Sequence, residues 1–165
     1  MAYRDGPSGI GGWLAFYIFT LAVSGPLVTI VVTYSNLFAD PSVAAAYGDR
    51  WPLLSSAEIA LTAVGVLSYY FIVWRLVARR NWHSVRLAIG AMWGLAIGFP
   101  LVDLLLVTTV GGLAVDSPFG LILPEMIRPF LYSALWTAYL LRSTRVANTY
   151  PRESDLDTDL AQVFE

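Results

Sequence analysis

The sequence contains no cysteine and no lysine, and its single histidine is His83. Without cysteine the chain cannot form disulfides, thiolate–zinc sites, iron–sulfur clusters or a thiol nucleophile. With one histidine it cannot supply two axial histidines to a haem. Charged residues are also scarce, at 13% of 165 residues, where a soluble domain has about a quarter. The composition therefore excludes most thiol and metal chemistry and argues against a water-soluble domain.

Sequence motifs that signal common enzyme classes are missing as well. None of GxxxxGK[ST], HExxH, GxSxG or GxGxxG occurs, so no nucleotide-binding or hydrolase fold is indicated. His83 has no second ligand at metal-binding spacing, and we interpret it as a loop residue at the membrane interface. We therefore expect no catalytic residue, no metal site and no cofactor. The arginines near His83 favour contact with anionic lipid and not with nucleic acid.

Long apolar runs dominate what the sequence does contain. Hydrophobic residues make up 57% of the chain, and its mean hydropathy is +0.63. About 20 apolar residues are enough to cross the hydrocarbon of a bilayer. The sequence predicts an all-α, polytopic membrane protein with a four-transmembrane-helix bundle in one domain, residues 1–165. Its helices are expected at about 11–34, 53–77, 85–110 and 124–141, with an acidic tail over 151–165.

The distribution of arginine predicts the orientation of the bundle. Eight of the ten arginines lie in or beside the N-terminal segment, the loop after the second apolar run, and the C-terminal segment. The two other loops contain only Arg50. Because arginine-rich loops stay in the cytoplasm, we expect both termini there. That orientation needs an even number of spans, which agrees with four apolar runs.

Three glycines in the third apolar run, Gly90, Gly94 and Gly98, are spaced four residues apart. This spacing places them on one face of a helix, where their lack of side chains lets a second helix approach closely. The pattern, a glycine zipper, predicts either packing inside the bundle or an outward face that docks a second copy or a partner.

Three ionisable residues lie within apolar runs toward the outer side of the membrane: Glu58, Asp103 and Arg128. A charge at that depth is costly unless it is paired or hydrated, so we expect Arg128 to bridge Glu58 or Asp103. Two acids and one base leave one carboxyl unmatched, and that group can bind a proton or a cation. The charge cluster therefore predicts either a structural latch or a site for an ion or ligand.

Polar and aromatic residues also recur at helical spacing along the second and fourth runs. The second run carries Thr62, Gly65 and Tyr69 after Glu58, and the fourth carries Tyr132, Trp136 and Tyr139 after Arg128. The two stripes are expected either to face each other across a polar cleft or to form an ordinary bundle interior.

The acidic tail contains Leu156, Leu160 and Val163 at i, i+4 and i+7. This spacing is that of a short amphipathic segment able to dock a partner; the alternative is a solvated chain end.

Three stretches together resemble a known family: GIGGWL at 9–14, WPLL at 51–54 with Glu58 after it, and LWTAYLLRSTRVANTY at 135–150. They are similar to a bacterial inner-membrane family catalogued as domain of unknown function 2569, the YdgK-like group. The family's ending is matched here by Ser143, Arg145, Val146, Thr149 and Tyr150. The resemblance implies a four-span inner-membrane protein and no established activity.

Two functions follow from these features. The first is a non-enzymatic accessory, scaffold or assembly subunit that packs in the lipid bilayer against other membrane-protein subunits or as a homo-oligomer. The second is a small proton- or cation-coupled carrier or sensor that uses Glu58, Asp103 and Arg128. A membrane-bound enzyme is a third alternative with little support. No internal repeat is evident, which disfavours an inverted-repeat transporter.

Overall fold

The protein is all-helical in the residues that the structure describes. The structure is a computed structural model, and it describes residues 6–112 and 118–152. Every regular element within these ranges is a helix, which confirms the all-α prediction. The predicted acidic tail, with Leu156, Leu160 and Val163, lies outside the described residues apart from positions 151 and 152.

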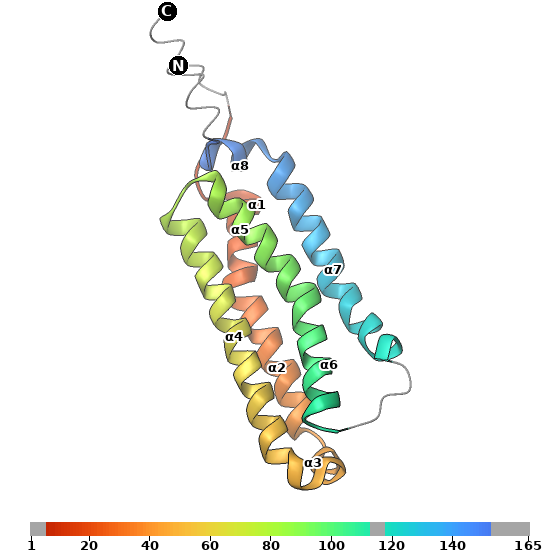
Figure 1. Ribbon diagram of the computed structural model, residues 1–165. Coiled ribbons are helices and arrows are strands. Elements are labelled where there is room, and N and C mark those ends of the chain that lie inside the picture. Colours follow the sequence, from red (N-terminus) through yellow and green to blue (C-terminus); the bar gives the residue numbers. More distant parts are fainter. Residues whose placement is uncertain (1–5, 113–117, 153–165) are drawn as a thin grey trace, which may run out of the picture.

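Four long helical segments run side by side in an elongated bundle within the described ranges (Figure 1). The first consists of α1 (Gly12–Phe19), the π-helical turn η1 (Thr20–Ser24) and α2 (Gly25–Phe38). After α3 (Pro41–Tyr47) and the short η2 (Gly48–Arg50), the second segment is α4 (Trp51–Ala78). The third consists of α5 (Trp82–Trp93), the π-helical turn η3 (Gly94–Gly98) and α6 (Phe99–Thr109). The fourth is α7 (Pro118–Arg142), followed by the short α8 (Thr144–Thr149).

Two element boundaries differ from the expectations in ways that matter for function. Asn81 caps α5 by accepting a hydrogen bond from the backbone N–H of Ser84 at 3.0 Å, so this helix begins at Trp82. The interpretation of His83 as a loop residue is therefore wrong, because His83 lies in the first turn of α5. The last long helix begins at Pro118, where the sequence suggested a start near residue 124.

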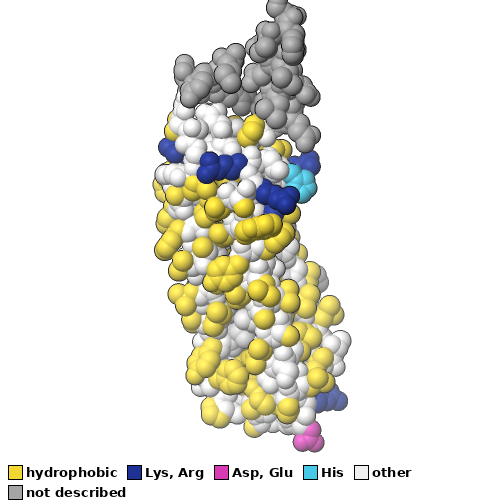
Figure 2. All heavy atoms as spheres, turned by 90° about the vertical axis from the view of Figure 1, so that its left-hand side faces the viewer, with side chains coloured by type: hydrophobic (Ala, Val, Ile, Leu, Met, Phe, Trp, Pro, Cys, Tyr) yellow, Lys and Arg dark blue, Asp and Glu magenta, His cyan; other side chains and the backbone are white. Residues whose placement is uncertain are grey.

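Three helical stretches within the described residues are long and apolar enough to cross a membrane: Gly12–Phe38, Pro41–Ala78 and Trp82–Thr109. Only 22%, 17% and 11% of their most apolar windows are buried inside the protein. The remaining apolar surface faces outward, where lipid but not water accommodates it. Figure 2 shows the same division on one face, with charged side chains at the two ends and hydrophobic side chains between them. The chain is therefore a membrane-embedded protein.

The first and third segments share a short sequence repeat, and both copies have the same irregular backbone. LAVSGPLV at 21–28 and LAIGFPLV at 95–102 begin and end with the same residues, and each spans the end of a π-helical turn. Proline cannot donate a backbone hydrogen bond, and its ring clashes with the carbonyl four residues earlier. The wider π turn before Pro26 and Pro100 relieves this clash in both segments. The repeat runs in the same direction in both segments, so it is a parallel repeat.

The hydrophobic core is concentrated at the end of the bundle where α8 and the α4–α5 connection lie (Figure 1). Tyr17 is fully buried at its centre, with its ring 4.7 Å from that of Trp136 and its hydroxyl 3.1 Å from the sulfur of Met92. The core consists of Leu14, Tyr17, Ile18, Leu21, Ile72, Leu76, Val85, Ala88, Met92, Trp136, Leu140, Val146 and Tyr150. The opposite end is packed less tightly, since α6 has no buried residue.

Tyr150, which is 74 positions from Leu76 in the sequence, caps the C-terminal end of α4. Because α4 stops at Ala78, the carbonyl of Leu76 has no partner within its own helix. The buried Tyr150 hydroxyl donates a hydrogen bond to that carbonyl at 2.9 Å. Burial raises the pKa of Tyr150 to about 12, against the lowering effect of nearby Arg80.

We expect Tyr150→Phe to lower the free energy of unfolding by about 1–2 kcal/mol, because it leaves a buried carbonyl unpaired. The folded-state pKa of Tyr150 is raised above its ordinary value of 10.0, so its contribution is present below pH 10.0 and lost as pH rises toward about 12. Thermal unfolding in detergent at a series of pH values measures both effects. Tyr70→Phe is the control, because Tyr70 lies at a half-exposed position of α4, and it should change the free energy of unfolding little.

Candidate functional site

The structure brings the two predicted intramembrane acids together. Glu58 lies in the second turn of α4, and Asp103 lies in the first turns of α6, just beyond Pro100. Glu58 is 9% exposed, whereas Asp103 is half-buried. The Glu58 side chain lies beside that of Asp103, and its Oε1 atom is buried without a hydrogen-bond partner among the described residues. We call these two residues the carboxyl pair.

Further polar groups from other elements surround the carboxyl pair. Tyr47 of α3 lies near both acids, and Glu125 of α7 lies near Asp103. Tyr47 is held by stacking on Trp51, with ring centroids 6.0 Å apart. Three acids therefore gather at this end of the bundle, drawn from α4, α6 and α7.

Arg128 does not take the place that the sequence suggested for it. Its side chain is exposed on α7, and in the described part of the chain it forms no ion pair with Glu58 or Asp103. The carboxyl of Glu58 lies beside a second carboxyl, and no basic side chain in the described ranges forms an ion pair with either acid. A buried carboxyl beside another carboxyl calls for a shared proton or a bound cation.

The polar and aromatic stripes on α4 and α7 both turn toward the first long segment. On α4, the hydroxyl of Thr62 hydrogen-bonds that of Thr33 at 2.7 Å, and the ring of Tyr69 packs directly against Gly25. On α7, the hydroxyl of Tyr132 lies 2.7 Å from that of Thr20.

Farther along α7, Trp136 packs on Tyr17 in the core, and the ring of Tyr139 stands edge-on to Trp136 at 5.6 Å. The two stripes thus place a row of hydroxyl groups along the bundle interior, beginning one turn from Glu58 at Thr62.

The glycine zipper faces outward. A side chain added at Gly90, Gly94 or Gly98 would meet no atom of the described structure within 4 Å. Neighbouring side chains instead pack closely against two other glycines, Gly25 and Gly65. A β-carbon at Gly25 would lie 2.7 Å from the Tyr69 ring, and one at Gly65 would lie 2.9 Å from the Phe99 ring. Sequence spacing did not single out Gly25, because its close neighbour comes from a distant part of the chain.

The two ends of the family-like pattern meet at the core end of the bundle. The backbone N–H of Gly9 donates to the hydroxyl of Thr149 at 2.9 Å, across 140 positions of sequence. Gly11 lies directly under the guanidinium of Arg145, where a β-carbon would be only 2.7 Å from Nη1. Ser143 caps α8 by accepting from the N–H of Val146. These residues join the first helix to α8.

A family model matches residues 7–151, nearly the whole chain. The chain belongs to the family described as Protein of unknown function (DUF2569). This confirms the resemblance to domain of unknown function 2569. The range matched to DUF2569 includes both the carboxyl pair and the Gly9–Thr149 junction. No curated protein and no solved structure was found to match the chain.

Substitutions at Glu58 and Arg128 distinguish a carboxyl pair from an ion-pair latch. Breaking a buried ion pair costs about 3–5 kcal/mol, because a charge is left unpaired. We expect Glu58→Gln to keep or raise the thermal stability in detergent, since the amide can donate to Asp103. Arg128→Gln, at an exposed position, should change stability by less than about 0.5 kcal/mol. A large loss of stability in both variants would instead support an ion pair between Glu58 and Arg128.

Proposed function

We propose that the protein is a non-enzymatic inner-membrane protein with four membrane-spanning helices and both termini in the cytoplasm. The 25-residue α7 runs beside the three apolar helical stretches and is long enough for a fourth span. The Gly9–Thr149 hydrogen bond supports an even number of spans, because it joins the two ends of the described chain on one side. The arginine-rich loops support the cytoplasmic assignment of that side.

Within this frame, the protein binds a proton at the carboxyl pair and acts as a small proton-coupled carrier. The proximity of Glu58 and Asp103 carries the proposal, because no arginine of the described residues forms an ion pair with either acid. Two ionised carboxylates in contact repel strongly in a medium of low dielectric constant. One proton held between them removes one charge and supplies the hydrogen that the contact requires.

A proton fits this site better than a metal ion does. Metal cations of the hard type take about six to eight oxygen ligands. Among the described residues, no group of three or more acidic or histidine side chains is arranged to hold a metal ion. Two carboxyl groups in contact provide too few ligands for such an ion, but they provide both partners of a shared proton.

The row of hydroxyls supplies a polar route away from the pair. Thr62 lies one helical turn beyond Glu58 on α4 and is bonded to Thr33. Tyr69 and Tyr132 continue the row toward the middle of the bundle, where Tyr132 is bonded to Thr20. Hydroxyl groups both donate and accept hydrogen bonds, so such a row can pass a proton or hold polar cargo.

Infrared spectroscopy tests proton binding without knowledge of the cargo. We expect the wild-type protein, reconstituted in lipid in neutral buffer, to show the C=O stretching band of a protonated carboxyl, because the pair shares a proton. Glu58→Gln should remove this band, and Asp103→Asn should shift or remove it. Asp49→Asn, an exposed acid at the same end, is the matched control and should leave the band unchanged.

Proton movement into liposomes under an imposed membrane potential then separates a carrier from a sensor. A carrier should lose this movement in Glu58→Gln and Asp103→Asn. If the band is the same in wild type and both variants, the site binds no proton and the proposal fails.

An accessory or assembly role is a second candidate, favoured by the outward position of the glycine zipper. Gly90, Gly94 and Gly98 leave a smooth strip on the third segment, where an added β-carbon would meet no atom of the described residues within 4 Å. In lipid such a strip allows close approach of another helix, from a second copy or from another subunit.

We expect Gly94→Leu to weaken self-association or co-purification with another membrane subunit, because leucine would hold the helices apart. Detergent size-exclusion with light scattering, together with pull-down from native membranes, provides the measurement. Leu105→Ala is the control, since Leu105 is an exposed apolar residue of the neighbouring α6. Monomers in both wild type and Gly94→Leu, with no co-purifying subunit, would argue against this role.

A further inference from the structure

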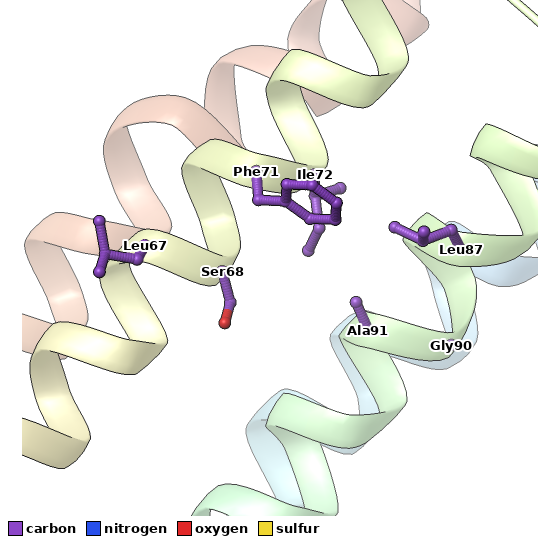
Figure 3. A pocket seen from close by; sticks show the side chains of 7 residues that line it. All are labelled: Leu67, Ser68, Phe71, Ile72, Leu87, Gly90 and Ala91. Carbon is purple, nitrogen blue, oxygen red and sulfur yellow. The ribbon is translucent and has the colours of Figure 1, made fainter. Parts of the chain in front are cut away.

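An open apolar groove runs between α4 and α5 near the core end of the bundle. Its volume is about 560 Å³, within the range of small-molecule sites, and its walls include Leu67, Ser68, Phe71, Leu87, Gly90 and Ala91 (Figure 3). The one hydroxyl among these residues, that of Ser68, already donates to the carbonyl of Val64 at 2.7 Å. The groove therefore offers hydrocarbon contacts and no unsatisfied hydrogen-bond donor along its length.

Basic side chains continue both walls of this groove by one helical turn. Arg75 lies four residues beyond Phe71 on α4, and His83 lies four residues before Leu87 on α5, so each shares a face with a groove residue. Arg86 stands in the same relation to Gly90. Figure 2 shows arginine and histidine side chains gathered at this end of the molecule.

The described residues accept hydrogen bonds from only part of the Arg75 guanidinium. Its Nη2 donates to Nδ1 of His83 at 3.2 Å, because a guanidinium can only donate. Its Nε is buried and has no hydrogen-bond partner. All five carboxylates of the described residues lie toward the opposite end of the bundle: Asp40, Asp49, Glu58, Asp103 and Glu125. Arg75 and the neighbouring His83 and Arg86 therefore form a basic group that can donate hydrogen bonds to an anion.

We propose that the α4–α5 groove and the basic turn beyond it bind one anionic phospholipid, with an acyl chain along the groove and the phosphate at Arg75. A phosphate diester offers the oxygen acceptors that a guanidinium fork prefers. Arginine at a membrane surface attracts anionic headgroups, and the groove lies immediately on the hydrocarbon side of Arg75. The phosphate of the lipid would therefore lie at Arg75, while its acyl chain would lie in the apolar groove on the hydrocarbon side.

Aromatic side chains place this end of the bundle at the depth where headgroups lie. Arg79 packs over the Trp74 ring at 5.9 Å, and Arg152 packs over the Trp82 ring at 4.3 Å. Tryptophan is enriched at the boundary between hydrocarbon and headgroups. The phosphate site of the groove is thereby at the level of a lipid phosphate.

Native mass spectrometry of the full-length protein in detergent tests this proposal with phosphatidylglycerol and phosphatidylcholine of identical acyl chains. We expect phosphatidylglycerol to bind about tenfold more tightly or better, through its net negative charge. Arg75→Gln with His83→Gln should abolish this preference. Arg86→Gln, at an exposed position, should reduce it even if the double variant folds poorly. Arg142→Gln removes the same charge at the same end but away from the groove, and should leave the preference intact.

A second pair of variants tests the groove. Gly90→Leu projects a side chain into the groove, since a β-carbon at Gly90 would meet no atom of the described residues within 4 Å, and should weaken the binding of both lipids. Gly94→Leu, one turn farther along the glycine zipper and outside the groove, should not.

Three results would overturn the proposal. Equal loss of preference in Arg142→Gln would show a general charge effect. Displacement of the lipid by glycerol 3-phosphate at similar concentration would show a site for a free phosphate. An unchanged preference for phosphatidylglycerol in a folded Arg75→Gln, His83→Gln variant would show that the basic turn does not bind the headgroup.

Discussion

Lipid offers the long helices neither donors nor acceptors of hydrogen bonds, so each polar group along them needs a partner within the protein. The π turns before Pro26 and Pro100 follow from this constraint, because each proline removes a backbone donor inside an apolar helix. The end of α4 follows it as well, since the Leu76 carbonyl is satisfied by Tyr150. Two buried atoms of α4 are exceptions among the described residues: Oε1 of Glu58 and Nε of Arg75 have no hydrogen-bond partner. A buried polar group that breaks this rule points to function.

The bundle divides into two halves with different physical character. At the arginine-rich end, the core around Tyr17 is closed by α8 and by the Gly9–Thr149 junction. At the other end α6 contributes no buried residue, and acids and threonines lie in the interior beside the buried Leu37 and Leu54. A tightly packed half holds the helices in register, while a loosely packed polar half can admit a proton and water. The proton site and the phospholipid site proposed for this protein therefore lie at opposite ends, and each can be changed without the other.

Several features of the site were predictable from the sequence, and the reasons are local. Glu58 and Asp103 stand out because an acid in an apolar run is costly wherever the run folds. Charge balance in the sequence favours Arg128 as their partner, whereas in the structure the Arg128 side chain is exposed on α7. The glycine zipper was visible from its spacing, but spacing alone does not say which face of the helix is covered. The short parallel repeat is inconspicuous in the sequence. It becomes evident from the π-helical turn that both of its copies share.

The sequence by itself determined the membrane environment, the helical class and the family. Apolar length, scarce charge and the motifs at 9–14 and 143–150 are properties of consecutive residues and do not depend on how the helices pack. Only the tertiary structure decided that Glu58 meets Asp103, that Gly25 and not Gly94 lies against a neighbouring ring, and that Arg75 stands at the end of a groove. Each of these depends on the rotation of one helix about its axis relative to another. In lipid that rotation is set by packing between helices, to which residues far apart in the sequence contribute together.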